Sequence, residues 1–138
     1  MQGFAGTNEW ANAFDLNEDQ QMILDNADRF SRNELYPLAE RMDNEEWWPE
    51  DAFPKIGDNG LFGITIPEEY GGAGLGLTEA ALMMQTVTRT GAGYSGASAI
   101  HLNIFGPKPL EKFGTPEQKQ ENLPKIISGE EKMCFAVT

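Results

Sequence analysis

Residues 114–138 read GTPEQKQENLPKIISGEEKMCFAVT and contain a helix start, a helix end and a final apolar run. Thr115 is a good N-cap residue, Pro116 suits the first helical position, and Gln118 can complete a capping box with Thr115. Gly129 is typical of the residue that follows the last turn of a helix. The stretch therefore predicts a well-bounded helix, followed by a segment of a different kind.

That following segment, residues 133–138, reads MCFAVT and is apolar and β-branched, which favours a β-strand. A strand needs a neighbour to satisfy its backbone hydrogen bonds, and no turn or partner strand follows it here. We therefore interpret residues 132–138 as the first strand of a truncated β domain, and the chain as a piece of a longer protein.

The upstream part of the chain has helical periodicity. Asn17 can cap a helix, with Gln20 as its capping-box partner, and apolar residues three and four positions apart follow from Ile23 to Met42. Pro37 lacks an N–H and crowds the preceding turn, so a kink or break is expected there. Residues 1–13 have no such pattern and are expected to form a flexible tail.

Three further helices are expected before the terminal one. The first is expected to begin at Pro49 and end at Gly60, and the second to begin at Thr78 and end at Gly91 and Gly93. The third is expected to run from Ser95 to Lys112. Pro107 and Pro109 are expected to bend the last of these helices, and Pro124 to break the terminal one. The predicted fold class is all-α, a helical bundle over residues 14–131 with one terminal strand.

A glycine-rich segment, residues 71–76, lies between the second and third expected helices. The preceding residues 64–66 alternate weakly and resemble a strand, which raises the question of a nucleotide-binding turn. The glycines do not have the G-x-G-x-x-G spacing, and no Walker lysine follows them. We interpret the segment as a tight loop in which some glycines have positive φ.

Composition excludes several functions. The formal charge is −12, from 22 acidic and 10 basic residues, so the chain has no basic patch suited to nucleic acid. No apolar run reaches the length of about 18 residues that a membrane span needs. Cys134 is the only cysteine, so the chain has no internal disulfide, and the N-terminus does not read as a targeting segment.

No catalytic constellation is visible in the sequence. One histidine and one cysteine provide neither a zinc site nor a catalytic triad. The adjacent glutamates, such as Glu68 and Glu69, are expected to be solvated. His101 shares a helical face with Ser98 and Phe105, and on the residues alone it reads as a structural histidine.

Three segments in order carry a family resemblance. They are the terminal stretch 114–138, the segment 60–75 reading GLFGITIPEEYGGAGL, and the helix start LNEDQ at residues 16–20. Together they resemble the acyl-CoA dehydrogenase family over roughly residues 14–138, at the N-terminal helical domain of that family. The resemblance implies that a middle β domain and a catalytic glutamate lie beyond the end of this chain, so no residue present here is expected to be catalytic.

The resemblance also implies the parent reaction, the α,β-dehydrogenation of an acyl-CoA thioester by FAD. The implied partners are the acyl-CoA substrate and an electron-accepting flavoprotein, and the implied assembly is a homo-oligomer in the bacterial cytoplasm or the mitochondrial matrix. It places flavin contacts on the terminal strand and the acyl slot on one helix. The implied flavin residues are Phe135, Ala136, Val137 and Thr138, and the implied slot residues are Ser98, His101 and Phe105.

Two alternatives stay open on the sequence. Acyl-CoA oxidases, nitroalkane oxidases and flavin monooxygenases share this domain, and the residues that distinguish them lie downstream. The chain could instead be a free-standing helical interaction module, although the unfinished strand after Gly129 argues against that.

Overall fold

The computed structural model describes residues 15–134 and Ala136, and these residues are mostly helical with no strand among them. The elements are α1 (Glu18–Phe30), η2 (Ser31–Leu35), η3 (Tyr36–Leu38), α2 (Ala39–Asn44), α3 (Ala52–Asp58), η4 (Glu68–Tyr70), α4 (Leu77–Val87), η5 (Thr88–Ala92), α5 (Gly93–Phe105), α6 (Lys108–Phe113) and α7 (Pro116–Ser128). The predicted all-α class is confirmed. The expected tail, 1–13, lies outside the described residues.

The expected terminal strand is only partly described. Lys132, Met133, Cys134 and Ala136 have no regular secondary structure, while Phe135, Val137 and Thr138 lie outside the described residues. The strand over residues 132–138 therefore stays a prediction, as do the domain limits drawn from it.

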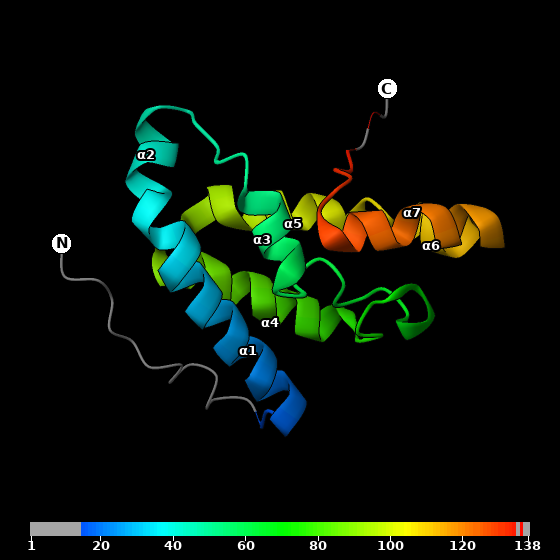
Figure 1. Cartoon of the computed structure of the whole chain (residues 1–138). Helices are drawn as coiled ribbons and strands as arrows, with labels where there is room; N and C mark the ends of the chain where they lie inside the picture. Colours follow the sequence, from blue (N-terminus) through cyan, green and yellow to red (C-terminus); the bar gives the residue numbers. More distant parts are fainter. Residues whose placement is uncertain (1–14, 135, 137–138) are drawn as a thin grey trace.

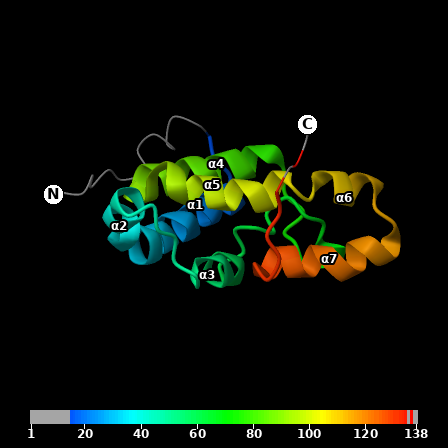
Figure 2. The same cartoon turned by 90° about the horizontal axis from the view of Figure 1, so that it is seen from above.

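The helices form two packed groups (Figures 1 and 2). Helices α1, α4 and α5 lie against one another, and Figure 2 shows α3 and α7 below this group, with α6 roughly continuing the line of α5. A main core fills the space between α1, α3, α4 and α5, with Phe30, Ile56, Met83, Ile100 and Ile104 nearly or fully buried. A second, smaller cluster lies under α7.

The two predicted capping boxes are confirmed. The Asn17 side chain accepts from the Gln20 N–H at 2.8 Å, and the Gln20 side chain accepts from the Asn17 N–H at 3.2 Å. Thr115 and Gln118 make the equivalent pair at the start of α7. The kink expected at Pro37 is also confirmed, because the α1 helix gives way to a π-helical turn and then to a 3₁₀ turn around that residue.

Several predicted helix limits are wrong. Helix α3 begins at Ala52 and not at Pro49, whose carbonyl accepts from the Ala52 N–H at 3.2 Å. The expected single helix 95–112 is two helices, α5 and α6, because Gly106 and Pro107 separate them.

Pro124 does not break α7, which runs from Pro116 to Ser128. Leu123 and Ile126, on either side of this proline, are fully buried in the second cluster. We attribute the unbroken helix to this packing, which offsets the cost of about 3 kcal/mol that an interior proline carries.

The start of α4 also differs from the prediction. Gly76, not Thr78, precedes the helix, and the Glu79 carboxylate accepts from the Gly76 N–H at 3.0 Å. The other oxygen of Glu79 accepts from the Gln20 side chain at 2.7 Å, which joins the start of α4 to the start of α1. A carboxylate in the first turn of the helix thus replaces the hydroxyl cap that the sequence suggested.

The glycine segment is the tight loop that was predicted. Gly71 and Gly74 have positive φ, and a Cβ at Gly72 would overlap the Ile66 carbonyl. The buried residues 61–66 are turns and bends, not the strand that their alternation resembled. The amides of residues 72–75 donate to carbonyls of residues 63–67, so they are not available to hold a phosphate.

Two glycines allow α3 and the end of α7 to approach closely. Gly129, which follows α7, has φ +78°, and a Cβ there would overlap the carbonyl oxygen of Phe53 in α3. A Cβ at Gly57 in α3 would overlap the carbonyl oxygen of Ser128. The contact is therefore between two backbones, and it has no room for a side chain.

We predict that Gly129→Ala destabilises the chain by about 2–4 kcal/mol, from the left-handed backbone and the lost close approach together. Gly60 is a matched control, because its φ is +73° but a Cβ there has no heavy atom within 4 Å. Gly60→Ala should cost only about 1 kcal/mol. Urea unfolding of the two variants checks this, and equal costs would contradict the close-approach argument.

We also predict a pH effect at Glu79. The hydrogen bond from Gln20 is the main cause that lowers the pKa of the Glu79 carboxyl, with the Gly76 amide adding to it. The stabilisation is therefore present above the ordinary glutamate pKa and is lost as the pH falls through the lowered folded pKa. Glu79→Gln should flatten the fall in unfolding free energy between about pH 5 and 3.

Urea unfolding measured across that pH range tests this expectation. Glu121, an exposed carboxyl on α7, offers the matched control Glu121→Gln. If both variants keep the wild-type pH dependence, the Glu79 contacts do not contribute in the way described.

Candidate functional site

Helix α5 forms one side of an apolar groove. Its sequence GYSGASAIHLNIF buries Ile100 and Ile104 toward the core and turns another side toward the surface. There it borders a groove of about 420 Å³ with the residues before and within α3 and the segment that leaves α7. The lining residues are Trp48, Phe53, Tyr94, Ser95, Ser98, Ala99, Leu102 and Lys132.

The groove has apolar walls with a few polar atoms. Trp48 and Phe53 meet edge to face at 6.3 Å between ring centroids, and the Lys132 ammonium lies 4.7 Å from the centre of the Phe53 ring. Tyr94 and Leu102 are exposed along the rim. An open apolar trough with scattered hydroxyl and ammonium groups suits an extended hydrocarbon chain better than a charged ligand.

The structure places the three predicted slot residues on α5 but not all in the groove. Ser98 lines the groove directly. His101 and Phe105 pair with each other, with 4.6 Å between ring centroids. His101 is exposed, and Phe105 is half-buried against the main core, so the pair lies along the helix beyond Ser98.

The predicted flavin residues lie at the end of the chain. Of these four, only Ala136 is among the described residues, and it is exposed, as is Cys134. The segment before them leaves α7 and, in Figure 2, runs beside α5. The flavin contacts of residues 135–138 therefore stay a prediction.

Asn103 holds this segment to α5, and it was not among the residues predicted from the sequence. Its Nδ2 donates to the carbonyls of Ile126 at 3.2 Å and Glu131 at 2.9 Å, and its Oδ1 accepts from the Met133 N–H at 2.9 Å. The side chain is fully buried. A carboxamide on an otherwise apolar part of a helix was the available signal, since such a group needs partners when buried.

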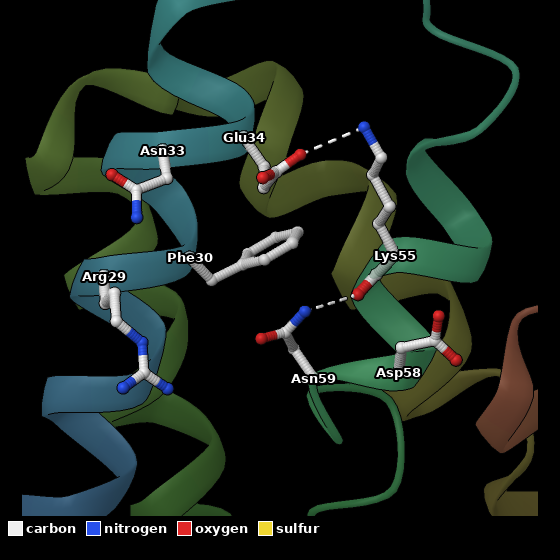
Figure 3. A pocket seen from close by; sticks show the side chains of 7 residues that line it. All are labelled: Arg29, Phe30, Asn33, Glu34, Lys55, Asp58 and Asn59. Carbon is white, nitrogen blue, oxygen red and sulfur yellow. Dashed lines mark hydrogen bonds and ion pairs between the residues drawn. The ribbon is translucent and has the colours of Figure 1, made fainter.

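A second, polar pocket of about 210 Å³ lies between α1, η2 and α3 (Figure 3). Figure 3 shows the Phe30 ring pointing toward α3, with polar side chains around it. Lys55 pairs with Glu34 at 3.0 Å across this pocket and with Asp51 at 2.9 Å outside it. These contacts raise the pKa of the Lys55 ammonium, the hydrogen bond to Asp51 being the larger cause.

A third pocket, of about 820 Å³, opens between α2 and the start of α5. The Tyr36 ring and the backbone around Gly91 border it, and a Cβ at Gly91 would overlap that ring. Helix α4 ends at Val87, before the glycines at which its end was predicted. Gly91 and Gly93 have positive φ, and they separate the helical backbone of η5 from α5.

Other site classes find no support in residues 15–134 and Ala136. No three His, Cys, Asp or Glu side chains there are grouped to hold a metal ion, and no helix there is long and apolar enough to cross a membrane. The adjacent glutamates at 45–46 and 68–69 are exposed, in agreement with the prediction that they are solvated.

Comparison with known proteins agrees with this fold. The family model described as "Acyl-CoA dehydrogenase, N-terminal domain" matches residues 17–130. The chain therefore belongs to the acyl-CoA dehydrogenase family and corresponds to the N-terminal domain of that family.

Two relatives illustrate the range of the family. The chain is 35% identical to acryloyl-CoA reductase (NADH) of Anaerotignum propionicum, over 91% of this chain and 31% of the relative. It is 36% identical to the mitochondrial short-chain specific acyl-CoA dehydrogenase of Homo sapiens, over 90% of this chain and 30% of the relative. The chain thus spans about a third of the length of these relatives.

Solved structures give the same picture. A chain of the structure described as electron transferring flavoprotein of Acidaminococcus fermentans matches with a TM-score of 0.77 and 37% identity, over 84% of this chain and 30% of that one. An acyl-CoA dehydrogenase complexed with FAD from Bacillus anthracis matches with a TM-score of 0.73 and 30% identity, over 86% and 20%.

Proposed function

We propose that this domain forms one wall of the acyl slot and the first flavin-contacting strand of an FAD-dependent enzyme that carries out α,β-dehydrogenation of acyl-CoA thioesters. The observation that carries the proposal is that the groove on α5 and the start of the exit segment adjoin. Lys132 of that segment lines the groove itself, and Met133 is bonded to Asn103 on the same helix. A substrate chain in the groove and a cofactor on the segment would therefore be neighbours.

The residues of the groove supply binding and exclusion of water, not proton transfer. Trp48, Phe53 and Leu102 offer apolar surface to a hydrocarbon chain, and removing that surface from water favours binding by about 25 cal/mol per Å². The Ser98 hydroxyl and the His101–Phe105 pair would set how far the chain reaches along α5.

The terminal segment would orient the cofactor. Bound FAD would supply the acceptor for the β-hydride of the substrate. Backbone groups of residues 135–138 and the Thr138 hydroxyl are suited to hydrogen-bond the pyrimidine edge of the ring, where such partners stabilise negative charge. The carboxylate that removes the α-proton would come from the part of the protein beyond this chain.

The relatives support the substrate class and the partner. Those above are named for acyl-CoA or acryloyl-CoA substrates, and one structural match is described as an electron transferring flavoprotein. We extend these to the longer protein: an acyl-CoA substrate, an electron-accepting flavoprotein partner, and a homo-oligomer of the bacterial cytoplasm or the mitochondrial matrix.

A comparison of the 138-residue chain with the longer protein that contains it tests this proposal. We predict that the chain alone retains no flavin and does not dehydrogenate an acyl-CoA with a dye acceptor, because the proton acceptor and most of the flavin site are elsewhere. The longer protein should do both. Dye reduction by the chain alone, or a longer protein that oxidises a nitroalkane and not an acyl-CoA, would overturn the proposal.

We further predict that Phe105→Ala in the longer protein shifts preference toward longer acyl chains, because the family resemblance assigns Phe105 to the acyl slot and a smaller side chain would lengthen that slot. One methylene in an apolar pocket changes kcat/KM by about 10-fold or more, so a series of acyl-CoA lengths resolves the shift. Phe113→Ala is the matched control, since Phe113 is 77% exposed on α6. Unchanged relative kcat/KM across the series would remove Phe105 from the slot.

A further inference from the structure

Asn103 makes three hydrogen bonds that join parts of the chain far apart in sequence. The bonds reach Ile126 in the last turns of α7 and Glu131 and Met133 in the exit segment. The residue is 0% exposed, so water does not compete for its carboxamide. Both ends of the side chain are used, the amide nitrogen as donor and the oxygen as acceptor.

These bonds are not explained by the needs of α5 itself. An asparagine in a helix interior is less favourable than alanine by up to about 0.7 kcal/mol. Its carboxamide bonds no residue of α5, and all three partners belong to α7 and the segment after it. The side chain therefore serves the position of that segment relative to α5.

Packing against α5 and a cation–π contact with α3 also hold residues 131–133 in place. A Cβ at Gly106 would lie 2.5 Å from the Met133 Cβ, so the Met133 side chain lies directly against the end of α5. Lys132 lies over the Phe53 ring of α3. The Glu131 N–H donates to the Lys125 carbonyl at 3.1 Å. Residues 131–133 are thus fixed against α3, α5 and α7 before the chain continues.

We propose that Asn103 is a positioning residue that sets the register between the acyl slot and the flavin-contacting strand. Asn103 lies two positions from His101 and two from Phe105 on α5, and its oxygen fixes the Met133 amide two positions before Phe135. One carboxamide thereby holds Glu131 and Met133, which lead into the predicted strand, against the helix that carries the predicted slot. The role in catalysis rests on the proposed function, whereas the register itself does not.

The first test uses the 138-residue chain and does not depend on any activity. Asn103→Asp keeps an oxygen for the Met133 N–H but replaces the donor to Ile126 and Glu131 with a carboxylate that faces their carbonyls. Hydrogen exchange of the Met133 amide should speed up about tenfold or more in this variant. Asn122→Asp is the matched control, because its amide donates only within α7, to Gln118 at 2.7 Å.

The second test uses the longer protein with FAD bound. Asn103→Asp should slow reduction of the flavin by saturating acyl-CoA by about tenfold or more, with substrate affinity close to that of Asn122→Asp, because a shifted strand alters the approach of the reacting atoms. Gly106→Ala retains Asn103, but its Cβ would overlap the Met133 side chain and also the Leu102 carbonyl oxygen. This variant should slow the same step, and it keeps the test decisive if Asn103→Asp does not fold.

The outcomes are separable. If the wild-type longer protein binds no FAD and reduces none, the proposed function fails, and the exchange result still decides whether Asn103 sets the register of the segment. Met133 exchange that is unchanged by Asn103→Asp overturns the positioning role. Fast Met133 exchange with an unchanged rate of flavin reduction in both variants overturns the link between the register and the chemistry.

Discussion

The backbone contact between α3 and the end of α7 is the constraint on which the rest of this structure depends. It requires Gly57 on one side and Gly129 on the other, because a Cβ at either position would overlap a carbonyl oxygen of the opposite element. The contact joins the main core to the smaller cluster under α7. It also decides where the chain leaves the domain, since Gly129 turns the backbone from α7 toward α5, where Asn103 receives it.

One helix therefore contacts everything that the proposed function needs from this domain. Helix α5 packs into the core through Ile100 and Ile104, borders an apolar groove through Ser98 and Leu102, and holds the exit segment through Asn103. In the proposed function, a helix with these three faces would couple the stability of the domain to the placement of the acyl chain and the flavin. The chain belongs to the acyl-CoA dehydrogenase family, and it spans about a third of the length of the relatives.

Local chemistry was predictable from the sequence, and tertiary compensation was not. The capping boxes at Asn17 and Thr115 and the positive φ of Gly71 and Gly129 depend on residues a few positions apart, so the pattern contains the information. The break expected at Pro124 failed because buried neighbours outweigh a missing hydrogen bond. Asn103 was missed because its hydrogen-bond partners lie 23 to 30 positions away in the sequence, and helical periodicity does not indicate contacts over that separation. The slot residues were placed by resemblance, and the flavin residues remain predictions.

The central claim is that this helical domain is followed in the natural protein by the flavin-binding part of a larger enzyme. The most direct measurement is the intact mass of the natural protein, with peptide sequencing across Thr138. We predict a protein about three times the length of this chain, in proportion to the relatives, with β-strand sequence beyond Thr138. A natural protein that ends at Thr138, or that continues into sequence unlike this family, would contradict the account.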